Sequence, residues 1–226
     1  MSDDNPRSQI LGGIRRALRR DALSGSAREA VEGRLASPPR GPAVARAELA
    51  QPARVDLFCQ WAEANNATVA RVSAAEVPAE VTNYLARNNL PAAAAMAPSP
   101  QLAEYDWALQ PLLSLRSGRA TASDQVSITG AFAGIAETGT LVMTSGSEHP
   151  VTLNFLPDTH IAVLKEEDIV AGYEDVWRKL RARYGKSVMP RTVNTITGPS
   201  RTGDIEQAME LGAHGPRRLH IVVVRE

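Results

Sequence analysis

Short apolar runs bounded by turn residues constrain the fold of this chain more than any other feature. The clearest are GTLVMT at 139–144, IAVL at 161–164 and LHIVVV at 219–224. Runs of this length are typical of buried strands, and their near-continuous apolar character favours parallel pairing in a sheet covered on both faces. Helical patterns alternate with the strands. We therefore predict an α/β fold, a mostly parallel sheet with helices on both faces.

The rest of the chain from residue 55 onward supports the same alternation. Apolar residues at helical spacing predict helices, and short apolar runs between turn signals predict strands. The predicted helices are 55–64, 78–88 and a helical stretch within 165–185, and the additional predicted strands are 68–72 and 92–96. The Ala-rich run at 92–96 is predicted as a strand because Pro91 and Pro98 bracket it too closely for a helix.

The first 45 residues differ from the rest in composition. Asn5-Pro6 is typical of a helix start, with Asn at the N-cap and Pro at the first helical position. An apolar stripe then recurs at helical spacing opposite several arginines, and its members are Ile10, Leu11, Ile14, Ala17 and Leu18. Because residues 36–45 are rich in Pro and Gly, we predict a helical arm and linker over 1–45 and an α/β domain over 46–226. The stripe would pack on the domain or a subunit, or attach to a membrane surface.

Composition excludes several classes of function. Lys+Arg and Asp+Glu both number 25, so the basic face of a nucleic-acid-binding protein is not expected. One cysteine, Cys59, cannot supply the several thiolates of an iron–sulfur cluster, and the four histidines show no helical pair typical of a metal site. No apolar run is long enough for a transmembrane helix, and the first residues lack the apolar core of a signal peptide. We expect a cytoplasmic protein that itself binds neither metal nor cofactor.

The first segment that could carry chemistry is ITGAFAGIAETGTLVMTSG, residues 128–146. Its glycines allow close approach of a ligand, and a carboxylate such as Glu137 in that setting could act as a base or nucleophile, with Thr138 and Thr140 beside it. The alternative is structural: Glu137 caps a turn, and the two threonines satisfy loop backbone groups.

A second segment is GPSRTGDIEQAMELGAHGP, residues 198–216. We predict a helix that begins near Thr202, buries 205, 208 and 209, and ends at Gly212, with Asp204 in its first turn. Ser200 and Arg201 would lie at the helix start, where a guanidinium and free N–H groups could bind a carboxylate or phosphate. Alternatively, Arg201 pairs with Asp204 or a neighbouring acid.

Two histidines complete the set of candidate residues. His160 in NFLPDTHIAVL directly precedes a predicted strand, where it could be a hydrogen-bonded strand end or a catalyst. His214 stands in a glycine-flanked turn, where it could be structural or line the same ligand site. We expect the site at the carboxyl ends of the strands, as open α/β sheets favour.

Three blocks, AETGTLV, LPDTHIAVL and TGPSRTGDIEQAMELGAHGPRRLHIVVV, together resemble the LUD-domain family, in particular its lactate-utilisation members. The resemblance is strong from Ile128 to the end of the chain. It implies a fold like that of the ribose-5-phosphate isomerase, glucosamine-phosphate deaminase and CoA-transferase group. It also implies a subunit that works with iron–sulfur partner proteins in oxidising L-lactate to pyruvate.

Three functions remain open at this stage. The first is a non-redox subunit of the lactate-utilisation system that binds a small carboxylate or phosphate-bearing ligand. The second is an independent enzyme, such as a transferase or sugar-phosphate isomerase, that uses Glu137. The third is an assembly factor whose N-terminal arm docks a partner. Each is compatible with a homo-oligomer.

Overall fold

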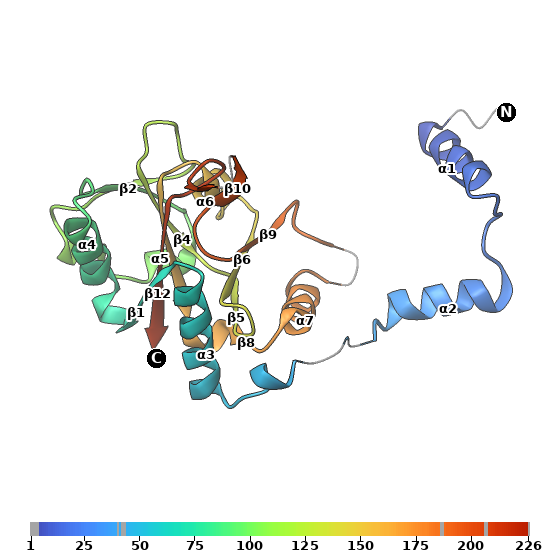
Figure 1. Ribbon diagram of the computed structural model, residues 1–226, viewed down its shortest axis with the longest axis horizontal. Helices are drawn as coiled ribbons and strands as arrows, with labels where there is room; N and C mark the ends of the chain where they lie inside the picture. Colours follow the sequence, from blue (N-terminus) through green and yellow to red (C-terminus); the bar gives the residue numbers. More distant parts are fainter. Residues whose placement is uncertain (1–4, 40, 42–43, 186–187, 206–207, 226) are drawn as a thin grey trace. The chain divides into compact units, whose positions relative to one another are not determined.

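The computed structural model describes residues 5–39, 41, 44–185, 188–205 and 208–225, and for 203–205 and 208–211 it describes the backbone alone (Figure 1). Contacts divide the chain into two units, Met1–Pro42 and Ala43–Glu226. The sequence placed the corresponding boundary after residue 45.

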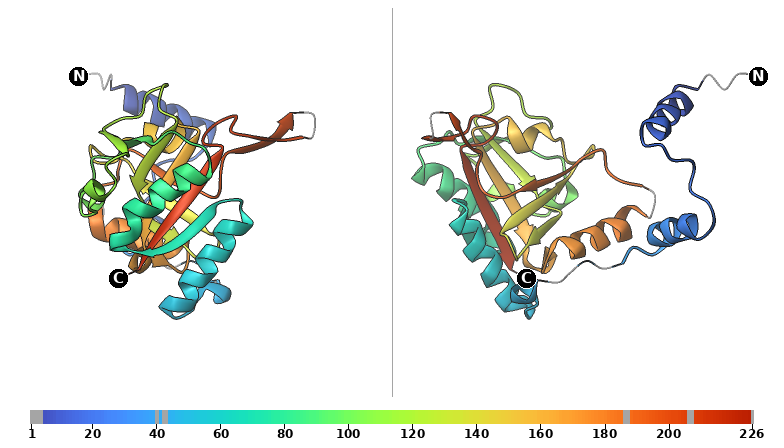
Figure 2. Two further views of the ribbon diagram at one scale, coloured as in Figure 1. Left: turned by 90° about the vertical axis from the view of Figure 1, so that its left-hand side faces the viewer. Right: turned by 45° about the vertical axis from the view of Figure 1, so that its right-hand side comes forward.

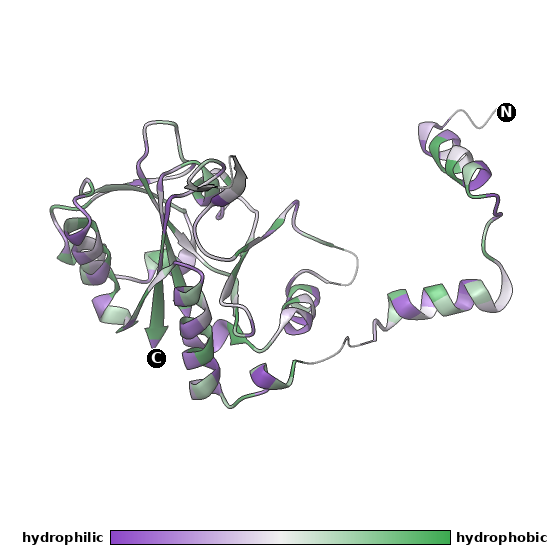
Figure 3. Ribbon diagram, in the orientation of Figure 1, coloured by the Kyte–Doolittle hydropathy of each residue, from purple (hydrophilic) through white to green (hydrophobic). Residues whose placement is uncertain are grey.

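The first unit contains two helices, α1 (Pro6–Ala17) and α2 (Gly25–Ala36). Asn5 caps α1, because its side-chain oxygen accepts a hydrogen bond from the Arg7 N–H at 3.0 Å. The predicted helix start is thus confirmed, whereas α2 was not predicted. Neither helix has a buried residue, and Ile10 and Leu18 of the predicted apolar stripe are 64% and 61% exposed. Figure 3 shows polar and apolar residues interspersed along both helices.

A six-stranded sheet forms the centre of the second unit. Its strand order is β1-β12-β7-β4-β2-β3, and every neighbouring pair is parallel. The bounds are β1 (Thr68–Ser73), β2 (Ala93–Met96), β3 (Ser114–Ser117), β4 (Val126–Gly130), β7 (Thr159–Lys165) and β12 (Arg218–Arg225). The predicted parallel sheet is therefore confirmed, with strands at four of the predicted places; β3 and β4 were not predicted.

Alternate residues of the central strands pack into different layers. In β12, Val222 and Val224 belong to one apolar cluster, and Ile221 and Val223 belong to another. Helices α4 (Val77–Arg87) and α5 (Pro100–Ala103) contribute to the first cluster, and α3 (Gln51–Ala64) contributes to the second. Figure 2 shows these helices beside the sheet. The prediction of helices on both faces is confirmed.

A smaller sheet shares the face covered by α3. Its order is β8-β5-β6-β9, with bounds β5 (Ala133–Ile135), β6 (Thr140–Thr144), β8 (Ile169–Val170) and β9 (Val193–Ile196). The apolar run at 139–144 predicts parallel pairing, but β6 pairs antiparallel with both β5 and β9. Only residues 136–139 link β5 to β6, and a link this short cannot make the crossover that parallel strands require.

Gly139 allows the turn between β5 and β6 to sit against helix α3. Its φ is 65°, and a Cβ at this position would lie 2.2 Å from the backbone nitrogen of Ala62. The turn is therefore fixed by backbone contact as well as by its sheet. Beyond the smaller sheet, α7 (Tyr173–Tyr184) buries Val176 and Leu180 in a third apolar cluster. The predicted helical stretch thus becomes the short helix η4 (Glu166–Asp168), then β8, then α7.

The predicted helix after Thr202 is wrong. The chain instead forms the antiparallel pair β10 (Arg201–Ile205) and β11 (Ala208–Leu211), in which Arg201 faces Leu211 and Thr202 faces Glu210. Backbone bonds fix its base: Ser200 N–H donates to Pro216 O at 2.8 Å, and Gly212 N–H donates to Ser200 O at 2.9 Å. These bonds at the base bring β10 and β11 side by side. This tertiary constraint outweighs the helical spacing of the three apolar residues 205, 208 and 209. Figure 2 shows the hairpin projecting from the sheet.

The remaining elements are short. They are η1 (Ala45–Ala47), η2 (Ala74–Glu76), η3 (Trp107–Leu109) and α6 (Thr152–Phe155). No helix within the described part of the chain has the length and apolar character needed to cross a membrane.

Candidate functional site

The structure distributes the sequence-predicted site residues over three places. Glu137 lies at the start of α7, Thr138 and Thr140 lie in a chain of hydroxyls, and His160, Ser200 and His214 line one cavity. The nine candidates therefore do not form a single site, although the hydroxyl chain leads from the first place to the third.

The Glu137 carboxylate is engaged by the beginning of α7. It is 8% exposed, and its Oε1 accepts a hydrogen bond from the backbone N–H of Tyr173 at 3.2 Å. A negative charge is favoured at that end of a helix because the first N–H groups lack intrahelical partners. The Glu137 carbonyl is also occupied, accepting a 3.0 Å hydrogen bond from the Arg46 guanidinium. These contacts fit the structural alternative for Glu137 better than the role of base or nucleophile.

A chain of hydroxyl groups runs from the β5–β6 turn toward β9. Thr138 Oγ1 lies 2.7 Å from Thr140 Oγ1, which lies 2.7 Å from Thr197 Oγ1. The hydroxyl of Tyr173 lies 3.5 Å from Thr140 Oγ1. Thr140 is fully buried, so this chain supplies partners for a hydroxyl that would otherwise lose its hydrogen bonds with water.

We call the third place the amino-edge pocket, because it lies at the amino ends of β7 and β12. Its volume is about 210 Å³. Its lining residues are Asn154, Phe155, His160, Thr195, Ile196, Thr197, Gly198, Pro199, Ser200, His214, Gly215, Pro216 and Leu219. We predicted that Ser200 would lie at the carboxyl ends of the strands, and this is wrong. The loops on both sides of the hairpin fold back over the amino ends instead.

His160 is the most deeply buried polar group of the pocket. It is fully buried, and its Nε2 lies 2.7 Å from the hydroxyl of Thr129. Its Nδ1 has no hydrogen-bond partner among the described residues. Burial lowers the pKa of His160 from 6.5 to about 4, so the ring is neutral at pH 7. One ring nitrogen of a neutral imidazole donates and the other accepts, which leaves Nδ1 able to serve a bound molecule in one of these roles.

Two glycines bring the walls of the pocket together. Gly198 has a φ of 75°, and a Cβ there would lie 2.0 Å from the Asn65 carbonyl oxygen at the end of α3. Across the pocket, a Cβ on Gly215 would lie 3.4 Å from Ser200 Cβ. Ser200 Oγ accepts a 3.3 Å hydrogen bond from the His214 N–H. The loop conformation at Gly198 is one that other residues adopt only with strain.

The predicted anion receptor at Arg201 lacks the free N–H groups that a helix start would have provided. Because residues 201–205 form a strand, there is no helix start to supply free N–H groups. Arg201 is exposed and donates to Asn66 Oδ1 at 3.1 Å, and neither Arg201 nor Thr202 lines the pocket. The side chain of Asp204 lies outside the described residues, so the alternative pairing of Arg201 with Asp204 is not described either.

Several pocket residues were not predicted. Asn154 is a buried amide in α6, and Thr195 and Thr197 come from β9 and the loop after it. A signal existed in the sequence: Asn154 precedes Pro157 and His160 in one segment, and Thr195 and Thr197 precede Gly198 in another. Each segment combines polar side chains with turn residues, but neither segment indicates that it lies beside the other in the folded protein.

No cluster of His, Cys, Asp and Glu within the described ranges has three members placed to hold a metal ion. The polar groups of the amino-edge pocket are hydroxyls, an amide, two imidazoles and backbone groups. Such a lining suits hydrogen bonding to a small organic molecule.

Comparison with known proteins identifies relatives of this chain. A sequence profile of the LUD domain matches residues 55–224. A protein named lactate utilization protein C from Deinococcus radiodurans is 31% identical over 159 residues, which cover 70% of this chain and 73% of that protein. A protein of the same name from Geobacillus thermodenitrificans is 33% identical over 132 residues, covering 57% of this chain and 53% of the relative. The chain thus spans about half the length of the latter protein.

A solved structure supports the fold. The crystal structure of a DUF162 family protein from Deinococcus radiodurans aligns with a TM-score of 0.60 at 23% sequence identity. The alignment covers 78% of this chain and 99% of that one. At this level of identity, the likeness concerns the fold alone.

Proposed function

The chain belongs to the LUD domain family, and from this premise we propose that it is a non-redox subunit of a lactate-utilisation system. In this proposal it supports oxidation of L-lactate to pyruvate together with iron–sulfur partner proteins. Relatives named lactate utilization protein C support a role in lactate utilisation. The partners would hold the clusters, since one cysteine cannot supply the ligands.

The observation that carries the proposal is the amino-edge pocket, a small polar cavity that separate segments of the family-matching domain form together. Residues from 154 to 219 line it, and all of them fall within the match at 55–224. Its volume of about 210 Å³ is below the roughly 300–1,000 Å³ of drug-sized pockets, so it suits an acid of a few carbon atoms. Neutral His160, Asn154 and Ser200 would hold the hydroxyl or carbonyl oxygen of that acid by hydrogen bonds.

Purification from lactate-grown cells tests the subunit role. The tagged full-length protein would be isolated gently, and the eluate examined by mass spectrometry and visible absorption. We expect iron–sulfur proteins to co-elute and the eluate to reduce an electron acceptor when lactate is added. A colourless protein that elutes alone, and whose removal leaves lactate oxidation intact, would contradict the proposal. An activity of the isolated chain would instead favour the independent enzyme.

Two buried histidines offer a matched test of the pocket. His160 and His220 lie on neighbouring strands, and burial lowers the pKa of each to about 4, but only His160 lines the pocket. We expect His160→Gln to reduce lactate-dependent acceptor reduction at least tenfold in the purified assembly, and His220→Gln to leave it within about twofold. Circular dichroism would verify that both variants fold. Equal activities of the two folded variants would remove the pocket from the proposal.

The assembly role rests on a different observation. Ile10, Ile14 and Leu18 repeat at helical spacing in α1 and remain 64%, 49% and 61% exposed. If this stripe binds a partner, then Ile10→Ser with Ile14→Ser would abolish co-elution without altering the unfolding of the domain. The double variant Arg15→Ser with Arg16→Ser, on the same helix, provides the control. Unchanged co-elution in the apolar double variant would exclude the stripe as a docking surface.

A further inference from the structure

A second, cationic cavity, which we call the arginine hollow, lies beside the carboxyl ends of β2 and β3 and the start of α6. Its volume is about 670 Å³. Its lining residues are Pro98, Gly118, Arg119, Ser145, Gly146, Ser147, His149, Pro150, Val151, Thr152 and Arg191. Pro98 follows β2, Gly118 follows β3 and Ser145 follows β6. None of these residues is acidic.

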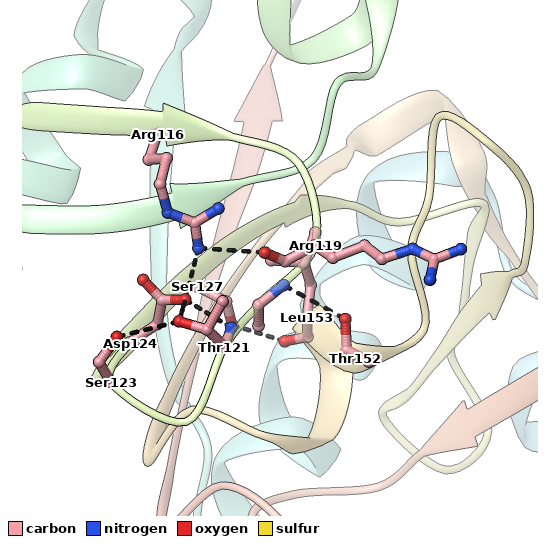
Figure 4. A network of polar contacts seen from close by, with 9 residues as sticks. Arg116, Arg119, Thr121, Ser123, Asp124, Ser127, Thr152 and Leu153 are labelled. Carbon is pink, nitrogen blue, oxygen red and sulfur yellow. Dashed lines mark hydrogen bonds and ion pairs between the residues drawn. The ribbon is translucent and has the colours of Figure 1, made fainter.

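The two arginines of the hollow have guanidinium groups without ion-pair partners among the described residues. The backbone at Arg119 is nevertheless fixed, because Arg116 donates a 3.0 Å hydrogen bond to the Arg119 carbonyl while also pairing with Asp124 at 2.5 Å. In Figure 4 the Arg119 side chain extends away from this network. On the other side, Ser145 N–H donates to Thr192 O at 3.0 Å, which holds the residue next to Arg191. Both cations are therefore carried by ordered backbone.

Two hydroxyls of the hollow accept backbone hydrogen bonds and keep a proton to donate. Ser145 Oγ accepts a 2.8 Å hydrogen bond from the Thr192 N–H, and Thr152 Oγ1 accepts a 3.2 Å hydrogen bond from the Ala120 N–H. Figure 4 shows Thr152 beside the loop that carries Arg119. A hydroxyl that accepts from a backbone N–H retains its own proton for another acceptor. The hollow thus combines two guanidiniums with two hydroxyl donors and no acid.

A neighbouring cavity shares one wall with the arginine hollow. Both are lined by Ser145, Gly146, Ser147 and His149, and the neighbour has a volume of about 700 Å³. In it Ser99, which is 3% exposed, and Gln101 present side-chain atoms without hydrogen-bond partners among the described residues, namely Ser99 Oγ and Gln101 Nε2. Buried polar atoms of this kind are usually satisfied, so they point to a bound polar molecule. Its acids are Asp168, paired with Lys179, and the exposed Glu148.

We propose that the arginine hollow binds the phosphate group of a small phosphorylated molecule. Two guanidiniums and two hydroxyls match the two negative charges and several acceptor oxygens of a phosphate monoester, and arginine binds phosphate bidentately. A monocarboxylate such as lactate would leave one arginine uncompensated. The uncharged part of the ligand would extend past the Gly146 turn toward Ser99 and Gln101. This site is separate from the amino-edge pocket and does not depend on the function proposed for it.

Thermal unfolding of the full-length protein with inorganic phosphate as the probe tests the site. We expect 10 mM phosphate to raise the Tm, because a ligand that binds only the folded state stabilises it, while sodium chloride of equal ionic strength does not. Arg119→Gln and Arg191→Gln should each weaken phosphate binding at least tenfold by calorimetry. Arg178→Gln, which removes an exposed arginine paired with Asp175 on α7, should bind as the unmodified protein does.

Conservative variants sharpen the test. Arg119→Lys and Arg191→Lys retain the charge but lose the bidentate geometry, so their affinities should lie between those of the unmodified protein and the Gln variants. Equal phosphate effects in all variants, or a Tm increase reproduced by sodium chloride, would overturn the proposal. No binding of phosphate by the unmodified protein would also overturn it. The Tm of each variant without phosphate provides the folding control.

Discussion

The two cavities, the amino-edge pocket and the arginine hollow, differ in size, charge and construction. At the amino ends, loops from residues 154 to 219 enclose a small pocket whose deepest polar group is a fully buried, neutral histidine. Beside β2, β3 and α6, the arginine hollow is about three times larger and presents exposed guanidiniums. Burial suits hydrogen bonding to a small ligand, whereas exposed cations suit capture of an anion from solution. The same domain therefore offers two kinds of recognition site.

Acid should affect the buried histidines of the central sheet most strongly. The folded-state pKa of His160 and of His220 is lowered by burial to about 4 from 6.5, so between these values the unfolded chain binds more protons. Their contribution to stability is present above pH 6.5 and is lost as the pH falls toward 4. Each histidine should account for a loss on the order of 3 kcal/mol over that range. Urea unfolding at pH 7 and pH 4.5 measures it.

Substitution of these histidines isolates the effect. His160→Gln and His220→Gln should each flatten the dependence of unfolding free energy on pH, and their effects should nearly add. Arg119→Gln, in the arginine hollow, should leave the slope as it is. A slope that remains unchanged in His160→Gln would show that this histidine does not resist protonation in the folded protein.

A matched pair of glycines compares the backbone beside the two cavities. Gly198 and Gly118 both have positive φ, at 75° and 126°, but only a Cβ at Gly198 would meet backbone, the Asn65 oxygen at 2.0 Å. Strain of this kind costs about 1–3 kcal/mol. We expect Gly198→Ala to lower the free energy of unfolding by more than Gly118→Ala, since a steric clash is added to the same strain. Chemical denaturation measures both. Equal losses would mean that the loop at Gly198 moves away from α3 without cost.

The smallest expected effect concerns Glu137. Glu137→Gln retains an acceptor for the Tyr173 N–H but removes the negative charge at the start of α7. A charge at a helix terminus contributes about 0.3–1 kcal/mol, rising to about 2 where it is partly buried. We expect a loss of about 1 kcal/mol, and less for Glu174→Gln in the same first turn. A loss of catalytic activity without any loss of stability would instead restore Glu137 as a base or nucleophile.

The sequence predicted the parallel sheet well because its strands are apolar on both faces. It did not reveal β4, whose residues Ser127 and Thr129 interrupt the apolar pattern. Both are buried, and each hydroxyl finds a partner far away along the chain: Ser127 donates to Leu153 O at 2.6 Å, and Thr129 lies against His160. Such distant partners satisfy the hydrogen bonds of polar groups inside a strand, and the local sequence pattern does not indicate which residues they are.

The candidate site was only partly predictable for the same reason. His160, Ser200 and His214 were identified individually from turn residues and apolar runs, and they meet in the amino-edge pocket. The error at residues 201–211 came from reading a local pattern where contacts at the base of the hairpin decide the structure. Arg119 and Arg191 have no sequence signal at all, because they come from separate loops and share only a cavity.

The carboxyl end of α3 holds two distant loops at once. Gly139 approaches the Ala62 backbone, Gly198 approaches the Asn65 carbonyl, and the Asn65 amide donates to Thr138 O at 3.2 Å. Substitutions at these positions should therefore be coupled to one another. A library that randomised either glycine alone would lose folded members, whereas joint changes at both glycines and Asn65 could recover them. The length of α3 is fixed in the same way, since one inserted residue would rotate its last turn by about 100° away from both loops.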